Sequence, residues 1–259
     1  MGSYKSMLTE VKNGIGYVYF NNPENNNRIG TAEGEEMIAA LEEIDKNSEA
    51  KIVILSGKGE YFCSGGKVAG FPDGKVVDTR YFQDVIMATV KAIHNMHKPI
   101  IAAVSTNALA GGFMYMDACD LAVVGEDSKF GLPEIQRGFF PMVALVALQR
   151  SIPKKRLFEM AYTGDLVDAK TVYNWNLVNY IVPNDKVMEK AEEIALRLKE
   201  YNPMSLNLGR DCYYSCLNMS IDDAMRYANV AMVNMVNTHD AKETAYAAAE
   251  KRKPKYLGY

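Results

Sequence analysis

The stretch PIIAAVSTNALAGG, residues 99–112, contains the local signals that decide the fold. Its first seven residues form a short apolar run, which is typical of a buried strand. The run ends in a turn that leads to Gly111 and Gly112, and a helix is predicted directly afterwards, over residues 112–118. Glycine at such a junction allows backbone N–H groups to approach a ligand closely, and the start of a helix adds partial positive charge.

The same alternation of strands and helices extends on both sides of this stretch. From residue 151 onward the pattern is mostly helical, and we find no internal repeat and no linker. Strand–helix alternation followed by helices predicts an α/β fold with a parallel-type sheet. We therefore expect a core domain over residues 1–198 and a helical region, suited to subunit contacts, over residues 199–259. The predicted strands are residues 15–21, 51–56, 99–105 and 121–125, the predicted helices before residue 151 are 31–47, 81–97 and 112–118, and residues 130–141 are predicted as a loop.

Composition limits the classes of protein that the chain can belong to. It has 259 residues, of which 48% are hydrophobic and 24% charged, so it is not a disordered chain. A net charge of −3 argues against nucleic acid as a partner. The polar N-terminus and the absence of an apolar run of about 20 residues argue against a signal peptide and a membrane span. The four cysteines show no paired spacing, which predicts reduced thiols in a cytoplasmic protein.

Methionine and histidine counts depart from the ordinary. There are 15 methionines and only three histidines. So few histidines leave little room for a metal site or for several histidine-based acid/base centres, so we expect no metal. The first interpretation of the methionines is adaptable filling of the core.

Two glycine loops are candidates for chemistry. One is Phe62-Cys63-Ser64-Gly65-Gly66, which follows the strand at residues 51–56, and the other contains Gly111. Two backbone N–H groups that converge from such loops form an oxyanion hole. The alternative is that the glycines only serve tight turns.

A third candidate is Glu134 in the segment Phe130-Gly131-Leu132-Pro133-Glu134-Ile135. Its neighbours are apolar, and Phe139, Phe140 and Met142 follow closely. A carboxylate in an apolar pocket has a raised pKa and is suited to moving protons. The alternative is a surface glutamate at a helix start after Pro133.

The ordered set of these motifs resembles the enoyl-CoA hydratase/isomerase (crotonase) family. The resemblance implies a ββα spiral core with a C-terminal helical trimerisation region, assembled as homotrimers that often pair into hexamers. The matching motifs, in chain order, are Asn21-Asn22-Pro23, Phe62–Gly66, Ile101-Ala102-Ala103-Val104, Ala110-Gly111-Gly112, Cys119-Asp120, Phe130–Glu134, Thr163-Gly164 and Glu250-Lys251-Arg252-Lys253-Pro254.

The resemblance also assigns roles to residues. The family's oxyanion amides match Gly66 and Gly111, and one of the two hydratase glutamates matches Glu134. The other falls on Met114, whose thioether can neither give nor take a proton. An apolar residue here, with Glu134 kept, resembles the family's Δ3,Δ2-enoyl-CoA isomerases. Glu134 would take a proton from the α carbon and return it to the γ carbon of a dienolate, in a pocket lined by Met114, Phe139, Phe140 and Met142.

The resemblance leaves other reactions open. Decarboxylase, C–C bond-forming and hydrolytic members act on coenzyme A (CoA) or carrier-protein thioesters, and the loop at residues 61–66 is similar to that of polyketide-pathway decarboxylases. Those lack the glutamate that Glu134 provides here. In carboxymethylproline synthases a C-terminal histidine acts in the site, and His239 lies in a comparable region. Hydratase activity is the least favoured of these hypotheses.

Recognition of CoA is implied by analogy, with CoA as part of the substrate and no separate cofactor. Ser64, Lys67 and Val68 would lie near its adenine end, and Lys251 and Lys253 would meet phosphates, in this family often on a neighbouring subunit. The family usually has aspartate where Lys67 stands. Lys67 would contact a CoA phosphate or a substrate carboxylate, or simply remain solvated. An acyl carrier protein is the alternative carrier of the acyl group.

Overall fold

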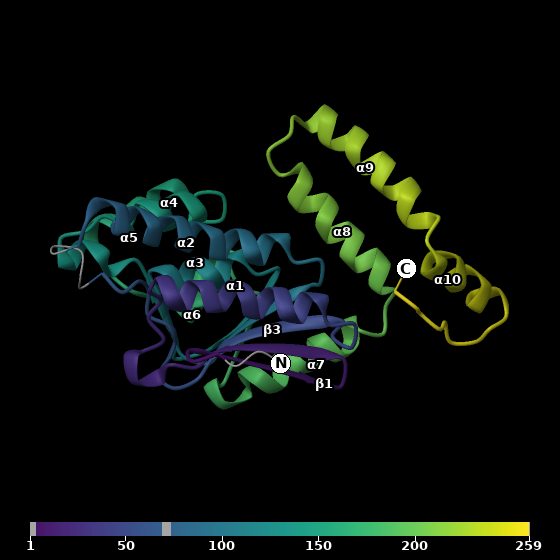
Figure 1. The fold of residues 1–259 in the computed structure, drawn as a ribbon, viewed down its shortest axis with the longest axis horizontal. Helices are drawn as coiled ribbons and strands as arrows, with labels where there is room; N and C mark the ends of the chain where they lie inside the picture. The colour runs from purple at the N-terminus through teal and green to yellow at the C-terminus, as the bar shows by residue number, and fades with distance from the viewer. Residues whose placement is uncertain (1–3, 69–73, 259) are drawn as a thin grey trace.

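The larger of two sheets forms the centre of the molecule (Figure 1). The computed structural model describes residues 4–68 and 74–258. The six strands lie in the order β1-β2-β3-β5-β7-β10, and all pairs are parallel except β1 with β2. The α/β fold expected from the sequence is therefore confirmed. The strands are β1 (Met7–Lys12), β2 (Ile15–Phe20), β3 (Ile52–Gly57), β5 (Ile100–Val104), β7 (Leu121–Gly125) and β10 (Tyr180–Val182).

The central strands are buried on both faces, which explains their continuous apolar sequences. In β3, Ile52 and Ile54 belong to one hydrophobic cluster, together with residues of α7 (Val187–Leu198). Val53 and Leu55 point to the opposite face and belong to the other cluster. Because side chains alternate along a strand, one apolar run supplies both cores.

A second sheet of four short strands, in the order β4-β6-β8-β9, continues from the first. β4 (Tyr61–Cys63) follows β3, β6 (Asn107–Leu109) follows β5, and β8 (Lys129–Gly131) follows β7. A helical segment then follows each of these short strands, so the chain repeats a ββα unit. β9 (Val167–Asp168) closes the sheet by antiparallel pairing with β8. The repeat brings the ends of β4, β6 and β8 side by side, where both glycine loops and the Glu134 loop begin.

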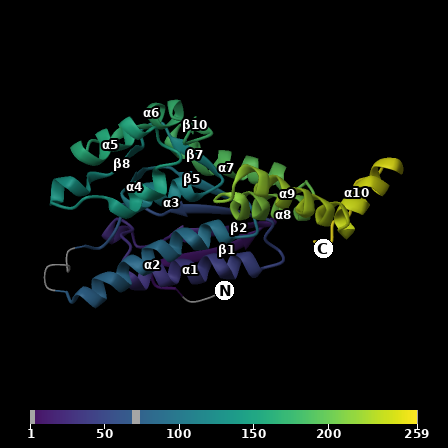
Figure 2. The same cartoon turned by 90° about the horizontal axis from the view of Figure 1, so that it is seen from above.

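Six helices share the larger hydrophobic cluster with the sheet and form the layer that covers one face of it. α1 and α2 pack against each other and α2 contacts α3. Figure 2 shows α1 and α2 lying alongside one another, with α4 and α5 above them in that view. The helices are α1 (Thr31–Lys46), α2 (Val76–Asn95), α3 (Gly111–Ala118), α4 (Met142–Leu148), α5 (Lys154–Thr163) and α6 (Ala169–Asn174).

Three C-terminal helices extend from one end of this core (Figure 2): α8 (Pro203–Cys216), α9 (Ile221–Val236) and α10 (His239–Ala249). Arg210 of α8 ties them to the core, because its Nε donates to Asp120 Oδ2 at 2.8 Å and its Nη2 donates to the Ile93 carbonyl at 2.7 Å. The division at residues 198 and 199 stays a prediction, although α7 ends at Leu198 and α8 begins at Pro203.

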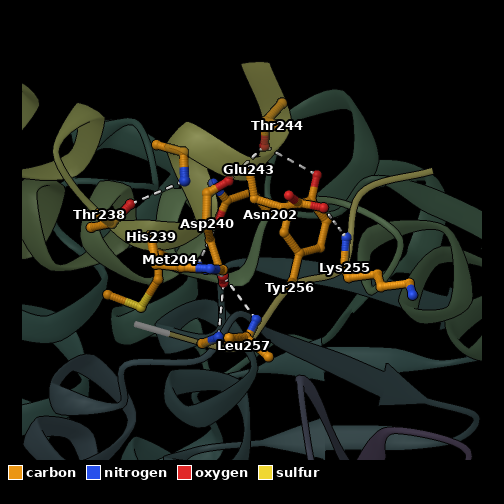
Figure 3. A network of polar contacts seen from close by, with 12 residues as sticks. Asn202, Met204, Thr238, His239, Asp240, Glu243, Thr244, Lys255, Tyr256 and Leu257 are labelled. Carbon is orange, nitrogen blue, oxygen red and sulfur yellow. Dashed lines mark hydrogen bonds and ion pairs between the residues drawn. The ribbon is translucent and has the colours of Figure 1, made fainter. Parts of the chain in front are cut away.

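The C-terminal tail folds back onto the start of α10 (Figure 3). Asp240 is fully buried there, and its two carboxylate oxygens accept hydrogen bonds from the backbone N–H groups of Leu257 and Gly258, both at 2.8 Å. Glu243 accepts from Lys255 N at 2.7 Å and pairs with Arg252. Hydrogen bonds from two backbone amides to a buried carboxylate hold the tail firmly against α10. The basic run at residues 251–253 lies in this tail.

Several local predictions were wrong or incomplete. α2 begins at Val76 rather than at residue 81. The prediction missed its first turn because Val76 and Val77 are exposed and do not continue the apolar stripe of the helix. The stretch 130–141 contains the end of β8 and a 3-10 helix, Pro133–Arg137. α4 and α10 were not predicted: α4 reads MVALVAL, apolar on every side, and α10 is rich in alanine, so neither shows helical periodicity. No helix within the described residues is long and apolar enough to cross a bilayer.

Candidate active site

The two glycine loops touch each other. Gly65 has a φ of +101°, which disfavours any residue with a Cβ, and a Cβ placed there would lie 2.5 Å from the Cβ of Ala110. A Cβ on Gly111 would lie 3.7 Å from the Gly65 Cα atom. The parallel pairing of β4 with β6 produces this approach, since each loop directly follows one of those strands.

Two backbone amides at this junction are left out of the regular pairing. In the pairing of residues 26–29 with 64–67, Ile29 N donates to Gly65 O and Lys67 N donates to Ile29 O, each at 2.9 Å, while the Gly66 N–H is skipped. Gly111 is the first residue of α3, so its N–H has no acceptor inside the helix. Ala110, just before it, has a positive φ of 54°. Both amides therefore lack a backbone acceptor at this junction, and their role as an oxyanion hole stays a prediction.

The two loops open onto a cavity of about 440 Å³. Nine of the residues predicted for the site line it, and they come from three parts of the chain, residues 64–68, 111–114 and 134–142. They are Ser64, Gly66, Val68, Gly111, Met114, Glu134, Phe139, Phe140 and Met142. Their individual roles stay predictions.

Glu134 is the single acidic residue among the described residues that line the cavity. It lies in the 3-10 helix Pro133–Arg137, and its Oε2 atom is buried without a hydrogen-bond partner. Burial raises the pKa of Glu134 to about 6, although a backbone hydrogen bond and the charge of Arg137 act in the opposite direction. A carboxyl group with this pKa changes protonation state near neutral pH, which suits a group that both takes and gives a proton.

Met114 forms part of the cavity wall from α3 and is only 1% exposed. Met116, on the same helix, is fully buried in the core instead. Met142 lies at the rim, where it is 70% exposed. Of the two methionines predicted for the site, Met114 is a buried member of the wall and Met142 is exposed.

Some lining residues were missed by the sequence analysis. Arg28 and Arg137 both line the cavity, as do Asn26 and Phe82. Arg28 follows the Asn-rich turn after Pro23, and no local pattern there indicates a site. Arg137 lies three residues after Glu134, and this spacing was the one available signal for it.

Lys67 does not line the cavity. Its ammonium nitrogen lies 2.6 Å from Glu33 Oε1, and Glu33 also accepts from the Gly30 N–H at the start of α1. The expected contact of Lys67 with CoA or a substrate carboxylate therefore has no support in this structure. The charge of Lys67 is balanced by Glu33, which lies 34 residues away in the sequence. Short-range sequence patterns do not reveal an ion pair between such distant residues.

Two further predicted residues, Lys251 and Lys253, and the histidine His239, whose role the sequence left open, also lie outside the cavity lining. Lys251 and Lys253 belong to the C-terminal tail, and His239 lies beside Asp240, 3.1 Å from Nδ1 to Oδ1 (Figure 3). The reading of His239 as an active-site residue thus gains no support within this chain. Cys63 is buried, and burial raises its thiol pKa to about 12, so it is a poor nucleophile.

The described residues contain no cluster of three or more histidine, cysteine or acidic side chains that could hold a metal ion.

Comparisons with known proteins agree with this geometry. The family model described as enoyl-CoA hydratase/isomerase matches residues 10–258. A rat protein named enoyl-CoA hydratase domain-containing protein 3, mitochondrial, is 28% identical over 95% of this chain and 82% of its own length. The crystal structure of the human enoyl-CoA hydratase domain-containing protein 3 has a TM-score of 0.93 at 25% identity, covering 97% of this chain and all of that one. An enoyl-CoA hydratase structure from Mycobacterium tuberculosis has a TM-score of 0.85 at 28% identity, covering 98% and 99%.

Proposed function

The chain belongs to the enoyl-CoA hydratase/isomerase family, and on that premise we propose that it moves a double bond in an enoyl-CoA thioester from the 3 position to the 2 position. One observation carries this proposal. The cavity wall presents one carboxylate, Glu134, and at Met114 it presents a thioether. A double-bond shift needs one group that moves a proton, whereas the family's hydration uses two carboxylates.

The reaction begins at the thioester carbonyl. The N–H groups of Gly66 and Gly111 would donate to its oxygen and make the α proton more acidic, and each such donor is typically worth about 2.7–4 kcal/mol in a transition state. Glu134 then takes the α proton, and the electron pair of the broken C–H bond spreads over a dienolate. The same carboxyl group returns the proton to the γ carbon, so the double bond moves and no atom is gained or lost.

The environment of Glu134 supports this double role. Its Oε2 atom has no hydrogen-bond partner and is free to meet a substrate proton. With a pKa of about 6, the group is mostly ionised at neutral pH, yet it is a strong enough base to be protonated within the cycle. Positioned acid–base catalysis of this kind contributes about 10²–10⁴-fold in rate.

Hydration is less well supported. The curated relatives are named hydratases, but water addition in this family uses a second carboxylate at the position of Met114. The Met114 thioether accepts hydrogen bonds weakly and cannot exchange protons at neutral pH. Its buried, apolar surface also disfavours an ordered water molecule at that point.

A single assay tests the proposal. The purified protein is incubated with trans-3-hexenoyl-CoA, trans-2-hexenoyl-CoA and a malonyl-type acyl-CoA, and the products are separated and weighed by mass spectrometry. We expect 3-hexenoyl-CoA to convert to its 2-enoyl isomer at unchanged mass, with little gain of water. Loss of CO₂ from the malonyl-type ester, release of free CoA, or carbon–carbon bond formation without isomerisation would favour the decarboxylase, hydrolase or bond-forming alternatives. The same three acyl groups, attached to acyl carrier protein instead of CoA, show which carrier the protein prefers.

We also propose that the protein assembles as a trimer or hexamer through its C-terminal helices. α9 has no buried residue, and it exposes large apolar side chains that include Ile221, Met225 and Val230. Burial of such a face between copies would remove it from water. Light scattering on a size-exclusion column should give the mass of three or six chains, and Val230→Lys with Met225→Lys should lower it. A monomeric wild-type protein would contradict this. A cytoplasmic location stays a prediction.

A further inference from the structure

The charged groups that line the cavity are mostly positive. Two guanidinium groups, Arg28 and Arg137, share the lining with one carboxylate, Glu134. No hydrogen bond or ion pair of the described residues joins either guanidinium group to Glu134, whose Oε2 atom has no partner. Arg137 is exposed and Arg28 is half-buried, so both guanidinium groups are accessible at the cavity and can form charge-assisted hydrogen bonds with an anionic group of a ligand.

Arg137 lies on the same turn as Glu134. Residues three apart in a 3-10 helix stack on one side, so both side chains can reach the cavity from Pro133–Arg137. Burial raises the pKa of Glu134 to about 6, and the charge of Arg137 acts weakly in the opposite direction. Arg137 therefore shares the lining with the proposed base and forms no ion pair with it.

Arg28 lies at a different part of the lining. It belongs to residues 26–29, which pair with the oxyanion loop through Ser64 N to Asn26 O at 3.2 Å and Ile29 N to Gly65 O at 2.9 Å. Arg28 therefore reaches the lining from the segment that pairs with the loop of Gly65 and Gly66, whereas Arg137 reaches it from the 3-10 helix of Glu134.

We propose that the preferred acyl group carries a second carboxylate, at the end remote from the thioester, and that Arg137 binds it. The inference rests on the proposed function, and it names the substrate class. A guanidinium group matches a carboxylate with two parallel hydrogen bonds. With the thioester oxygen held at Gly66 and Gly111 and the far carboxylate held at Arg137, the carbon chain between them passes Glu134.

The test measures binding rather than turnover. Isothermal titration calorimetry compares two pairs of saturated acyl-CoA esters of equal chain length, hexanoyl with adipoyl and butyryl with succinyl. We expect the wild-type protein to bind one carboxylated ester about tenfold to hundredfold more tightly than its partner, which is the range for a charge-assisted hydrogen bond. Arg137→Gln should remove that preference and leave the affinity for the uncharged ester intact, which also shows that the variant is folded.

Arg28→Gln is the matched control. It should change the dissociation constants of the carboxylated and the uncharged ester equally, so that their ratio stays as in the wild type. The same esters of pantetheine, which carry no phosphate, separate the two sources of anionic oxygen. If Arg137 contacts a CoA phosphate instead, Arg137→Gln will weaken both CoA esters equally and neither pantetheine ester, and the inference is wrong. It is also wrong if the wild-type protein shows no preference in either pair, or if the preference survives in Arg137→Gln.

These outcomes are separate from those of the proposed function. Saturated esters cannot isomerise, so a clear preference in the titrations together with an inactive isomerisation assay would overturn only the proposed reaction. Rapid isomerisation of 3-hexenoyl-CoA with no preference for a carboxylated ester would overturn only the inference about Arg137.

Discussion

Glu134 and Met114 line the same cavity from two separate segments, the 3-10 helix after β8 and the first turns of α3. The carboxyl oxygen of Glu134 is buried without a hydrogen-bond partner, and the side chain of Met114 is almost completely buried. This pairing of one unsatisfied carboxylate with one thioether is the observation on which the proposed double-bond shift rests.

Glu134→Gln should abolish isomerisation, because the amide neither takes nor gives a proton at neutral pH. We expect kcat to fall by about 10²–10⁴-fold while binding of saturated acyl-CoA is kept. Steady-state kinetics with 3-hexenoyl-CoA measures the first quantity and calorimetry the second.

Glu126→Gln, at an exposed position outside the cavity, is the control and should behave as the wild type. In the wild type, kcat/KM should rise as the pH increases through about 6 and then level off, because the ionised carboxylate is the base. Near-wild-type activity in Glu134→Gln would rule out the mechanism.

The same carboxyl group should make stability depend on pH. Its pKa is raised from 4.5 to about 6 in the folded protein, so the native state holds the proton more tightly than the unfolded chain. Below pH 4.5 both states are protonated. Between pH 4.5 and pH 6, unfolding releases a proton, so the free energy of unfolding falls as the pH rises. The total loss, reached above pH 6, is up to about 2 kcal/mol.

Glu134→Gln carries no such group. Its free energy of unfolding should therefore gain up to about 2 kcal/mol relative to the wild type between pH 4 and pH 8. Urea unfolding of both proteins at the two pH values measures this difference. A difference that does not change with pH would mean that the Glu134 carboxyl is not desolvated in the folded protein.

Met114→Glu should introduce some hydration of crotonyl-CoA, because it places a second carboxylate on the wall of the cavity. The gain is measured as 3-hydroxybutyryl-CoA formed. Met114→Gln is the matched control, since it has a similar size but no acid. Equal hydration by the two folded variants would show that a carboxylate at this position cannot activate water here.

Lys67→Met should leave the dissociation constant for CoA within about twofold, because the lysine pairs with Glu33 outside the cavity. Loss of this partly exposed ion pair should lower the free energy of unfolding by less than about 1 kcal/mol. Calorimetry with CoA and urea unfolding measure the two effects. A tenfold loss of affinity would restore the role in CoA binding that the sequence suggested.

Gly65→Ala should disturb the oxyanion amides. The positive φ disfavours alanine, and the new methyl group would collide with Ala110. We expect a loss of about 1–3 kcal/mol in stability and about 10²–10³-fold in kcat, as when an oxyanion donor is displaced.

Gly209→Ala, in the interior of α8, has open space around the new methyl group and should instead be slightly more stable. Thermal unfolding and steady-state kinetics compare both variants. Normal turnover by Gly65→Ala would show that the Gly66 amide does not depend on this loop conformation.

Short-range patterns were enough for much of the fold. The apolar runs of β3 and β5 identified these strands, because a strand buried on both faces needs apolar side chains at nearly every position. The alternating pattern of β2 and the turn after it identified that strand. The amphipathic stripe of α1 identified that helix. Elements without such a stripe, α4 and α10, escaped detection because their burial comes from contacts that local periodicity does not record.

The candidate site divides in the same way. The sequence by itself determined the two glycine loops and Glu134 as candidates, since these depend on residue type and local turn stereochemistry, and the family resemblance added that Met114 stands where a hydratase has an acid. Only the tertiary structure decided that Lys67 pairs with Glu33, that Arg28 and Arg137 reach the cavity, and that Asp240 holds the C-terminal tail. A charged side chain selects its partner from whatever the fold brings within a few ångströms, and that partner is commonly tens of residues away along the chain.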